Sequence, residues 1–256
     1  MFHFACTTAY YHSSDALEDV KQLLVQREPT NMGMRRFYDL EGMQRVFGWR
    51  RGAYERSTAE QLMPNIAVYC HATVQLPDGA RKLVHVLNLV GYALDSPRQP
   101  DYAYFRARPY SDLVVAYTRM WQLALACAKD LKEEGRIHRI HVYNVGGGAF
   151  AGPYSGRDTF GAAFTPLRAE FERAGIEVIG YDWRSHTFDE HALIPDILED
   201  EEEVRGTLFV NAWDPWSFVG NGNASDHSLD GAWGQISNMS VLAWPLTNPQ
   251  IRFRAV

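Results

Sequence analysis

The chain has 256 residues, 46% of them hydrophobic and 22% charged, which suits one globular domain with an elaboration or two small domains. Its net charge of −6 and pI of about 5.8 exclude a broad nucleic-acid-binding surface. No apolar run is long enough to cross a bilayer, so no membrane partner is expected. The three cysteines, Cys6, Cys70 and Cys127, form no CxxC pair, which favours a reducing, cytoplasmic compartment over a disulfide framework or a zinc site.

Residues 1–60 are predicted to form a helical extension or lid, and residues 61–256 the main domain. Ser13, Ser14 and Asp15 are plausible caps for an amphipathic helix over residues 16–26. A second short helix is predicted over residues 40–49. Several arginines make this region locally basic, which is more typical of a solvated face than of a binding patch.

Residues 65–75 and 82–92 are predicted strands, and Pro77-Asp78-Gly79 between them is typical of a hairpin turn. The strands carry His71 and His85. Both are candidate ligands, but lone histidines in strands are more often hydrogen-bonded core or edge residues. Residues 95–109 are predicted to be a loop, whose aromatic side chains either reach a ligand or only pack.

The middle of the chain predicts a helix over residues 112–134 that ends at Gly135, and a strand over residues 137–145. A glycine-rich segment, residues 146–153, follows this strand directly. Next come a helix over residues 160–174, starting near Asp158 or Thr159, and a strand over residues 176–181. This order is a phosphate-binding arrangement in outline. It matches neither the GxGxxG dinucleotide pattern nor a P-loop.

A second polar loop follows the predicted strand over residues 207–210. Ligands of open α/β sheets bind outside the carboxyl ends of strands, where glycines let the backbone approach them closely. The alternative interpretation is a surface turn rich in Asn, Gly and Asp. The acidic run 199–203 is predicted to be solvated, and the tail to close the domain as a helix or strand. The polar loop contains Asn211, Asp214, Gly220, Asn221, Gly222, Asn223, Asp226, Asp230 and Gly231.

These two glycine-bearing loops resemble those of the macrodomain family. The segment Val210-Asn211-Ala212-Trp213-Asp214 is similar to the family's V-N-A-A-N strand end, and residues 148–153 are similar to its G-I-F-G-Y-P phosphate loop, with Ala151 at a usual glycine. The Asn-bearing strand comes last here, so residues 65–234 resemble a circularly permuted macrodomain. The Asp-rich loop is more similar to the glycohydrolase branch, in particular to bacterial effector-type enzymes that remove ADP-ribose from an arginine of ubiquitin.

The resemblance implies a three-layer α/β/α mixed sheet that binds ADP-ribose or an ADP-ribosylated protein, in the narrower match ubiquitin. It implies that Phe150 packs on the distal ribose and that Asn211 bonds the hydroxyls of that ribose. Either Asp196 or Asp200 takes the adenine amino group, and Asn223 belongs to the ligand-binding loop. The diphosphate is held by amides around Gly146, Gly147, Gly148, Ala149, Phe150, Gly220, Asn221 and Gly222.

Cleavage of a glycosidic bond at ribose passes through an oxocarbenium-like state that a carboxylate stabilises. Asp214, Asp226 and Asp230 are the candidate catalytic residues, although Asp226 and Asp230 are also placed to cap a helix and sit in its first turn. The predicted function is an ADP-ribosyl hydrolase, cytoplasmic or delivered into a host cytosol as an effector. The alternatives are a non-catalytic reader and a hydrolase of a free ADP-ribose derivative. No cofactor is expected; the Asp cluster leaves Mg²⁺ or Ca²⁺ binding open, although its spacing matches no EF-hand loop.

Overall fold

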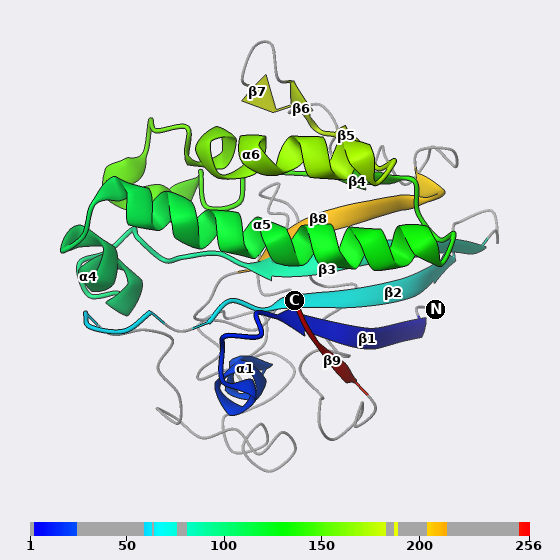
Figure 1. Cartoon of the computed structure of the whole chain (residues 1–256), viewed down its shortest axis with the longest axis horizontal. Coiled ribbons are helices and arrows are strands. Elements are labelled where there is room, and N and C mark those ends of the chain that lie inside the picture. The colour runs from blue at the N-terminus through cyan, green and yellow to red at the C-terminus, as the bar shows by residue number, and fades with distance from the viewer. Residues whose placement is uncertain are drawn as a thin grey trace.

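The computed structural model describes residues 3–24, 59–62, 64–75, 81–182, 187–188, 204–213 and 251–256. These residues form a mixed seven-stranded sheet with helices packed on it, which confirms the predicted α/β class (Figure 1). The strands lie in the order β5-β4-β8-β3-β2-β1-β9. Their bounds are β1 His3–Tyr11, β2 Ala67–Gln75, β3 Arg81–Val90, β4 Arg139–His141, β5 Glu177–Ile179, β8 Thr207–Trp213 and β9 Arg252–Ala255.

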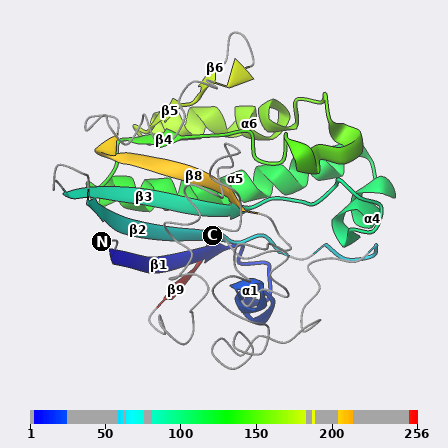
Figure 2. The same ribbon diagram turned by 180° about the vertical axis from the view of Figure 1, so that it is seen from behind.

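The sheet has a parallel half and a mixed half. Strands β5, β4, β8 and β3 run parallel, so their carboxyl ends meet at one edge, on the left in Figure 1 and on the right in Figure 2. Strand β2 is antiparallel to β3, with which it is consecutive in the chain, and is also antiparallel to β1. Strand β9 runs parallel to β1, with Thr8 opposite Arg252. A separate two-stranded ribbon joins β6 (Tyr181–Asp182) to β7 (Thr187–Phe188).

Two helices, α5 (Tyr110–Glu133) and α6 (Thr159–Arg173), cover one face of the sheet (Figure 1). Trp121 of α5 is fully buried and meets Phe160 and Phe164 of α6 edge-to-face, with ring centroids 5.3 and 4.9 Å apart. Burying such aromatic rings supplies much of the packing free energy of a domain. Helix α1 (Leu17–Leu24) contributes Val20 to a second cluster, which also contains Val68 and Ile251.

The predicted helix ends agree with the structure. Asp158 caps α6, because its Oδ1 accepts the amide of Gly161 at 2.7 Å. Gly135 and Gly175 follow α5 and α6 with φ of +69° and +67°, a conformation that favours glycine after a helix. The strands predicted over residues 65–75 and 82–92 are β2 and β3. The helix predicted over residues 16–26 is the slightly shorter α1.

Two segments differ from prediction. Residues 3–11, assigned to the helical extension, form β1 of the main sheet, so the domain boundary near residue 60 does not separate them from it. Their aromatic residues and threonines have high strand propensity. Residues 100–106, predicted as loop, form helix α4, because Pro100 occupies its first turn, where a missing N–H costs nothing.

Several predictions fall on residues outside the described ranges. They are the helix over residues 40–49, the turn over residues 77–79, the acidic run 199–203 with Asp196, and the polar loop from residue 214 to residue 234. Within the part of the chain that is described, no helix is long and apolar enough to cross a membrane.

Candidate functional site

The carboxyl edge of the parallel strands brings together two of the predicted site segments. Strand β8 pairs with β4 on one side and β3 on the other, with Phe209 opposite His141 and Asn211 opposite Asn88. The glycine-rich turn follows β4, and Asn211 to Trp213 end β8. About sixty residues separate the glycine-rich turn from the end of β8 in the sequence. Because β4 and β8 are parallel neighbours, both segments nevertheless leave the sheet at the same edge, as a shared site requires.

The glycine-rich turn is fixed by close packing at two glycines. Gly146 has φ of +78°, and a Cβ there would collide with the Tyr117 ring. Gly152 has φ of +52°, and a Cβ there would collide with the Leu94 carbonyl. The amide of Leu94 donates to the Phe150 carbonyl at 3.0 Å, so the turn is bonded to the segment that follows β3. The turn is consequently held against two neighbouring elements.

Several amides of this turn remain available to a ligand. Those of Gly147 and Ala151 donate within the turn, to Asn144 and Gly148 carbonyls at 3.1 and 3.0 Å. No hydrogen bond within the described residues uses the amides of Gly148, Ala149 and Phe150, and Gly148 is exposed. Successive free amides in a turn form a concave, positively polarised surface that suits an anion.

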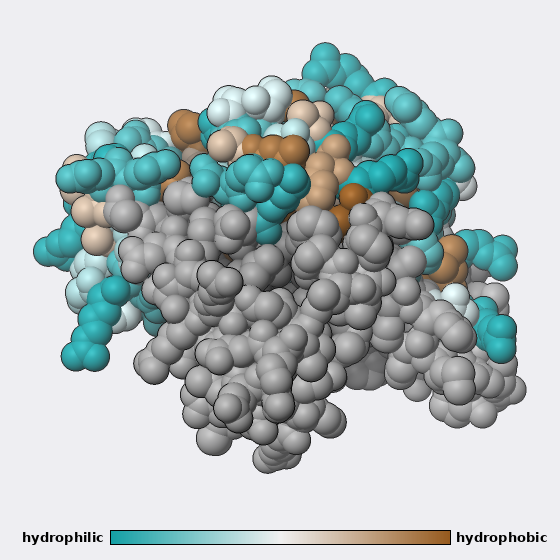
Figure 3. All heavy atoms as spheres, turned by 90° about the horizontal axis from the view of Figure 1, so that it is seen from below, coloured by the Kyte–Doolittle hydropathy of each residue, from teal (hydrophilic) through white to brown (hydrophobic). Residues whose placement is uncertain are grey.

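Phe150 is the exposed aromatic side chain of the turn. Hydrophilic residues occupy most of the described surface visible in Figure 3. Large exposed hydrophobic side chains are few in the described ranges, and Phe150, 36% exposed, is one of them. A ring held at the surface beside unused amides is placed to pack on a ligand.

Asn211 has a structural use that the sequence did not indicate. It is completely buried, and its Nδ2 donates to Oδ1 of Asn88 at 2.9 Å. Asn88 is buried too, and its Nδ2 donates to the Val68 carbonyl at 3.2 Å. These two side-chain hydrogen bonds link β8 to β3 and β3 to β2 inside the sheet. The contact of Asn211 with a ribose stays a prediction.

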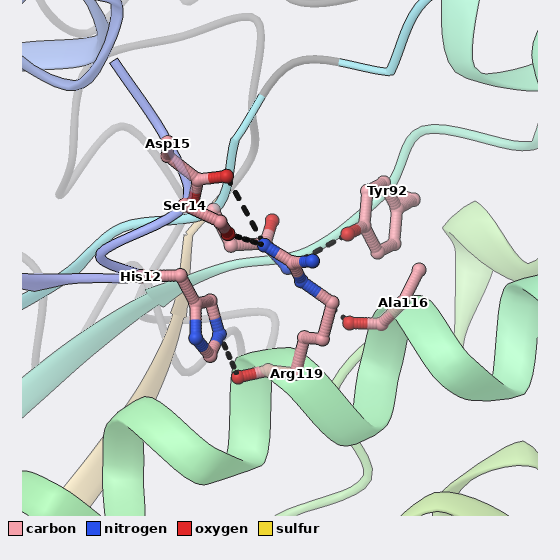
Figure 4. A network of polar contacts seen from close by, with 7 residues as sticks. His12, Ser14, Asp15, Tyr92, Ala116 and Arg119 are labelled. Atoms are coloured by element: carbon pink, nitrogen blue, oxygen red, sulfur yellow. Dashed lines mark hydrogen bonds and ion pairs between the residues drawn. The ribbon is translucent and has the colours of Figure 1, made fainter. Parts of the chain in front are cut away.

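A polar pocket of about 340 Å³ opens beside Tyr92, just after β3 (Figure 4). Asn65 donates to the Tyr92 hydroxyl at 2.7 Å, and Asp15 and Asp112 also line the pocket. Arg119 of α5 crosses it to Asp15 Oδ1 at 3.1 Å. The pocket therefore presents both carboxylates and a guanidinium at the edge of the sheet that carries the glycine-rich turn.

The same arginine holds the turn between β1 and α1. Its Nη2 donates to Ser14 Oγ at 3.2 Å, and its carbonyl accepts from His12 Nε2 at 2.8 Å (Figure 4). Burial lowers the pKa of His12, which keeps the imidazole neutral. Ser14 and Asp15, predicted as helix caps, thus serve as partners of Arg119.

Of the two strand histidines, His85 is a core residue and His71 is half-buried. His85 is buried, with Nδ1 2.7 Å from the Tyr69 hydroxyl, and burial lowers its pKa to about 4. His71 lies 3.4 Å from Arg136 Nη2, and its pKa is also lowered, first by burial and then by that guanidinium. In the described ranges no group of three or more His, Cys, Asp or Glu residues is arranged to hold a metal ion.

Two of the three cysteines, Cys70 and Cys127, are poorly placed to act as nucleophiles. Cys70 and Cys127 are buried free thiols. Burial raises the pKa of Cys127 well above its ordinary value, so the reactive thiolate is disfavoured.

The described residues do not include the predicted catalytic carboxylates. Asp214, Asp226 and Asp230 lie outside them, as do Gly220, Asn221, Gly222 and Asn223. Sequence reasoning also missed residues that shape the site, among them Asn65, Tyr92, Asp101, Asp112 and Arg119. Asp101 is buried and accepts the amide of Ala93 at 3.0 Å, fixing the segment after β3. The only feature of the sequence that could have indicated the role of Asp101 is its position after Pro100, a pair of residues typical of the first turn of a helix.

No protein-family model matches the chain, and a search of curated proteins finds no significant match.

Proposed function

We propose that this protein binds ADP-ribose at the carboxyl edge of its parallel strands and hydrolyses the bond that joins ADP-ribose to a modified protein. The observation that carries the proposal is the row of amides at Gly148, Ala149 and Phe150, which donate to no described residue and lie in an exposed turn. A diphosphate needs such donors and no net positive charge. The chain's charge of −6 is therefore compatible with binding this anion.

The neighbouring groups suit the rest of the ligand. The exposed Phe150 ring offers an apolar surface for a ribose. The end of β8 lies between β3 and β4, so the loop that follows Trp213 starts at the edge that carries the turn. The pocket beside Tyr92 adds polar side chains at that edge. We assign Asn211 a positioning role through its bond to Asn88, in addition to the predicted ribose contact.

The chemical step in this proposal belongs to the carboxylates of the polar loop. Asp214, Asp226 or Asp230 stabilises the positive charge that develops at the anomeric carbon, or activates the attacking water. The leaving side chain takes a proton from a neighbouring acid. An arginine-linked conjugate, with ubiquitin as the protein, is the narrower form of the proposal. The cytosol, of the producing cell or of a host, is the compartment proposed.

Calorimetry with ADP-ribose against AMP tests the binding step, and a panel of Arg-, Ser- and Glu-linked conjugates tests hydrolysis. The sharpest variant is Ala149→Pro, which deletes one amide N–H at the first position of a 3₁₀ turn, where proline is tolerated. We expect weaker ADP-ribose binding with unchanged folding. Unchanged affinity in this variant would contradict the diphosphate site.

The panel also separates the rival functions. Binding without turnover of any conjugate would identify a reader. Turnover of ADP-ribose-1″-phosphate, with protein conjugates spared, would identify an enzyme for free nucleotide derivatives. Replacing Asp226 or Asp230 by Ala and retaining full activity in both variants would remove them from the mechanism.

A further inference from the structure

A small basic hollow lies at the opposite end of the sheet, where β3 and β8 begin, on the right in Figure 1. Its volume is about 250 Å³. Four cationic residues line it, and none of its described wall residues is acidic. The described walls are Arg81, Lys82, Leu83, His85, Arg136, Val204, Arg205 and Gly206. We propose that this hollow binds a small phosphate-bearing anion, at a site separate from the glycine-rich turn.

The cations reach the hollow from three segments that are bonded together. Arg81 and Lys82 open β3, Arg136 follows the end of α5, and Arg205 precedes β8. The amides of His138 and Arg139 donate to the Gly206 carbonyl at 2.8 and 3.2 Å, which ties the second segment to the third.

Gly206 makes this junction possible. It has φ of +69°, and a Cβ there would collide with the His138 ring. The close approach of the two segments therefore requires glycine. The three segments form a fixed frame, so the cations converge without a rearrangement of the chain.

Arg136 is the best-defined cation of the hollow. Its guanidinium lies 5.4 Å from the Tyr69 ring centroid and 3.4 Å from His71 Nδ1. Its Nη1 pairs with Glu134 at 3.2 Å, but that carboxylate is 50% exposed, and exposed pairs contribute little. Burial first, and the positive field of Arg136 second, lower the pKa values of both His71 and His85.

Electrostatics favours an anion here. No ion pair engages Arg81 in the described part of the chain, and the pair at Arg136 is a surface one. Like charges gathered in a concave surface raise the local concentration of counter-ions. Guanidinium groups bind phosphate through two parallel hydrogen bonds, which distinguishes it from a point anion such as chloride. The volume admits a phosphoryl group and a small carrier, so the ligand is a small molecule.

The test is an NMR titration of the full chain with inorganic phosphate, pyrophosphate and a sugar phosphate, against chloride at equal ionic strength. We expect the His71 and His85 ring signals to move with the phosphate compounds and not with chloride. Comparing free phosphate with the sugar phosphate shows whether the carrier contributes. Ring signals that respond equally to chloride would overturn the proposal.

Two arginine variants make the test specific. Arg81→Gln removes an exposed cation of the hollow, and Arg168→Gln removes an exposed cation of α6, so the net charge changes equally. We expect Arg81→Gln to weaken pyrophosphate binding about tenfold and Arg168→Gln to leave it unchanged. Equal weakening in both would show non-specific attraction. Ala149→Pro should not affect this binding, which separates the hollow from the site of the proposed function.

The chain's own acidic run supplies a last control. Residues 199–203 directly precede Val204, a wall of the hollow, in the sequence, so a variant tests whether their carboxylates compete with an external anion. In a variant with Glu201, Glu202 and Glu203 changed to Gln, we expect pyrophosphate to bind somewhat more tightly than in the unaltered protein. Binding that occurs only in this variant would mean that the hollow serves the chain itself, and would overturn the proposal.

Discussion

The packing of the glycine-rich turn gives a quantitative prediction for Gly152→Ala. With φ of +52° and ψ of −125°, Gly152 lies outside even the left-handed helical region, so an L-residue is strained there by about 1–3 kcal/mol. The new Cβ would also collide with the Leu94 carbonyl, so the turn must move. The movement breaks the bond between the Leu94 amide and the Phe150 carbonyl, at a cost of about 1–2 kcal/mol. We expect a total loss of about 3 kcal/mol in the free energy of unfolding.

Gly156→Ala is the matched control, because Gly156 has φ of +84° but open space around its Cβ position. Only the backbone strain applies there, about 1 kcal/mol. Urea unfolding followed by tryptophan fluorescence should separate the two variants by about 2 kcal/mol, and thermal unfolding by roughly 4–8 °C. Equal losses in the two variants would refute the assigned packing of Gly152 on Leu94. Only Gly152→Ala should also weaken ADP-ribose binding, since it displaces Phe150.

Three further variants test the site and the sheet. Phe150→Ala should lower ADP-ribose affinity roughly five- to tenfold with little loss of stability. Calorimetry checks this beside Val256→Ala, an exposed residue that does not line the pocket at Tyr92, and equal affinities would exclude the ring contact. Burial lowers the pKa of His85 to about 4, so the unfolded chain takes up the proton first and stability falls as pH drops from 6.5 toward 4. His85→Asn should remove on the order of 2–3 kcal/mol of that fall; an unchanged pH slope in urea unfolding would contradict it. Asn211→Ala should cost about 2 kcal/mol, because it removes the buried hydrogen bond that Asn211 Nδ2 donates to Asn88 Oδ1. A cycle with Asn88→Ala should show coupling above about 0.5 kcal/mol, and additive losses would argue against the bond.

The sequence predicted correctly those helix bounds and caps that depend on residues close to one another in the chain. The periodicity of α5, the Asp158 cap and the glycines after α5 and α6 each act within one or two turns, so the sequence shows them directly. Strand β1 was missed because its partner β2 lies some sixty residues away and no turn signal connects them. Helix α4 was missed because its proline is also typical of a loop.

The candidate site divides in the same way. The glycine triplet is visible in the sequence, but the need for glycine at residues 146 and 152 appears only when Tyr117 and Leu94 are seen beside them. The pair of Asn211 with Asn88 joins residues 123 positions apart. The contact of Arg119 with Asp15 spans 104 positions. Such contacts depend on strand order, which local propensity does not determine.

The pairing of β9 with β1 has a consequence for biosynthesis. Strand β9 pairs with β1, and Arg254 Nε forms an ion pair with Asp130 Oδ2 at 2.7 Å. Translation proceeds from the N-terminus, so β1 is synthesised long before β9, and the flank of β1 that β9 covers stays unpaired by β9 until those later residues are made. Deleting residues 252–256 would leave that flank open permanently and promote self-association, a liability that exposed strand edges carry.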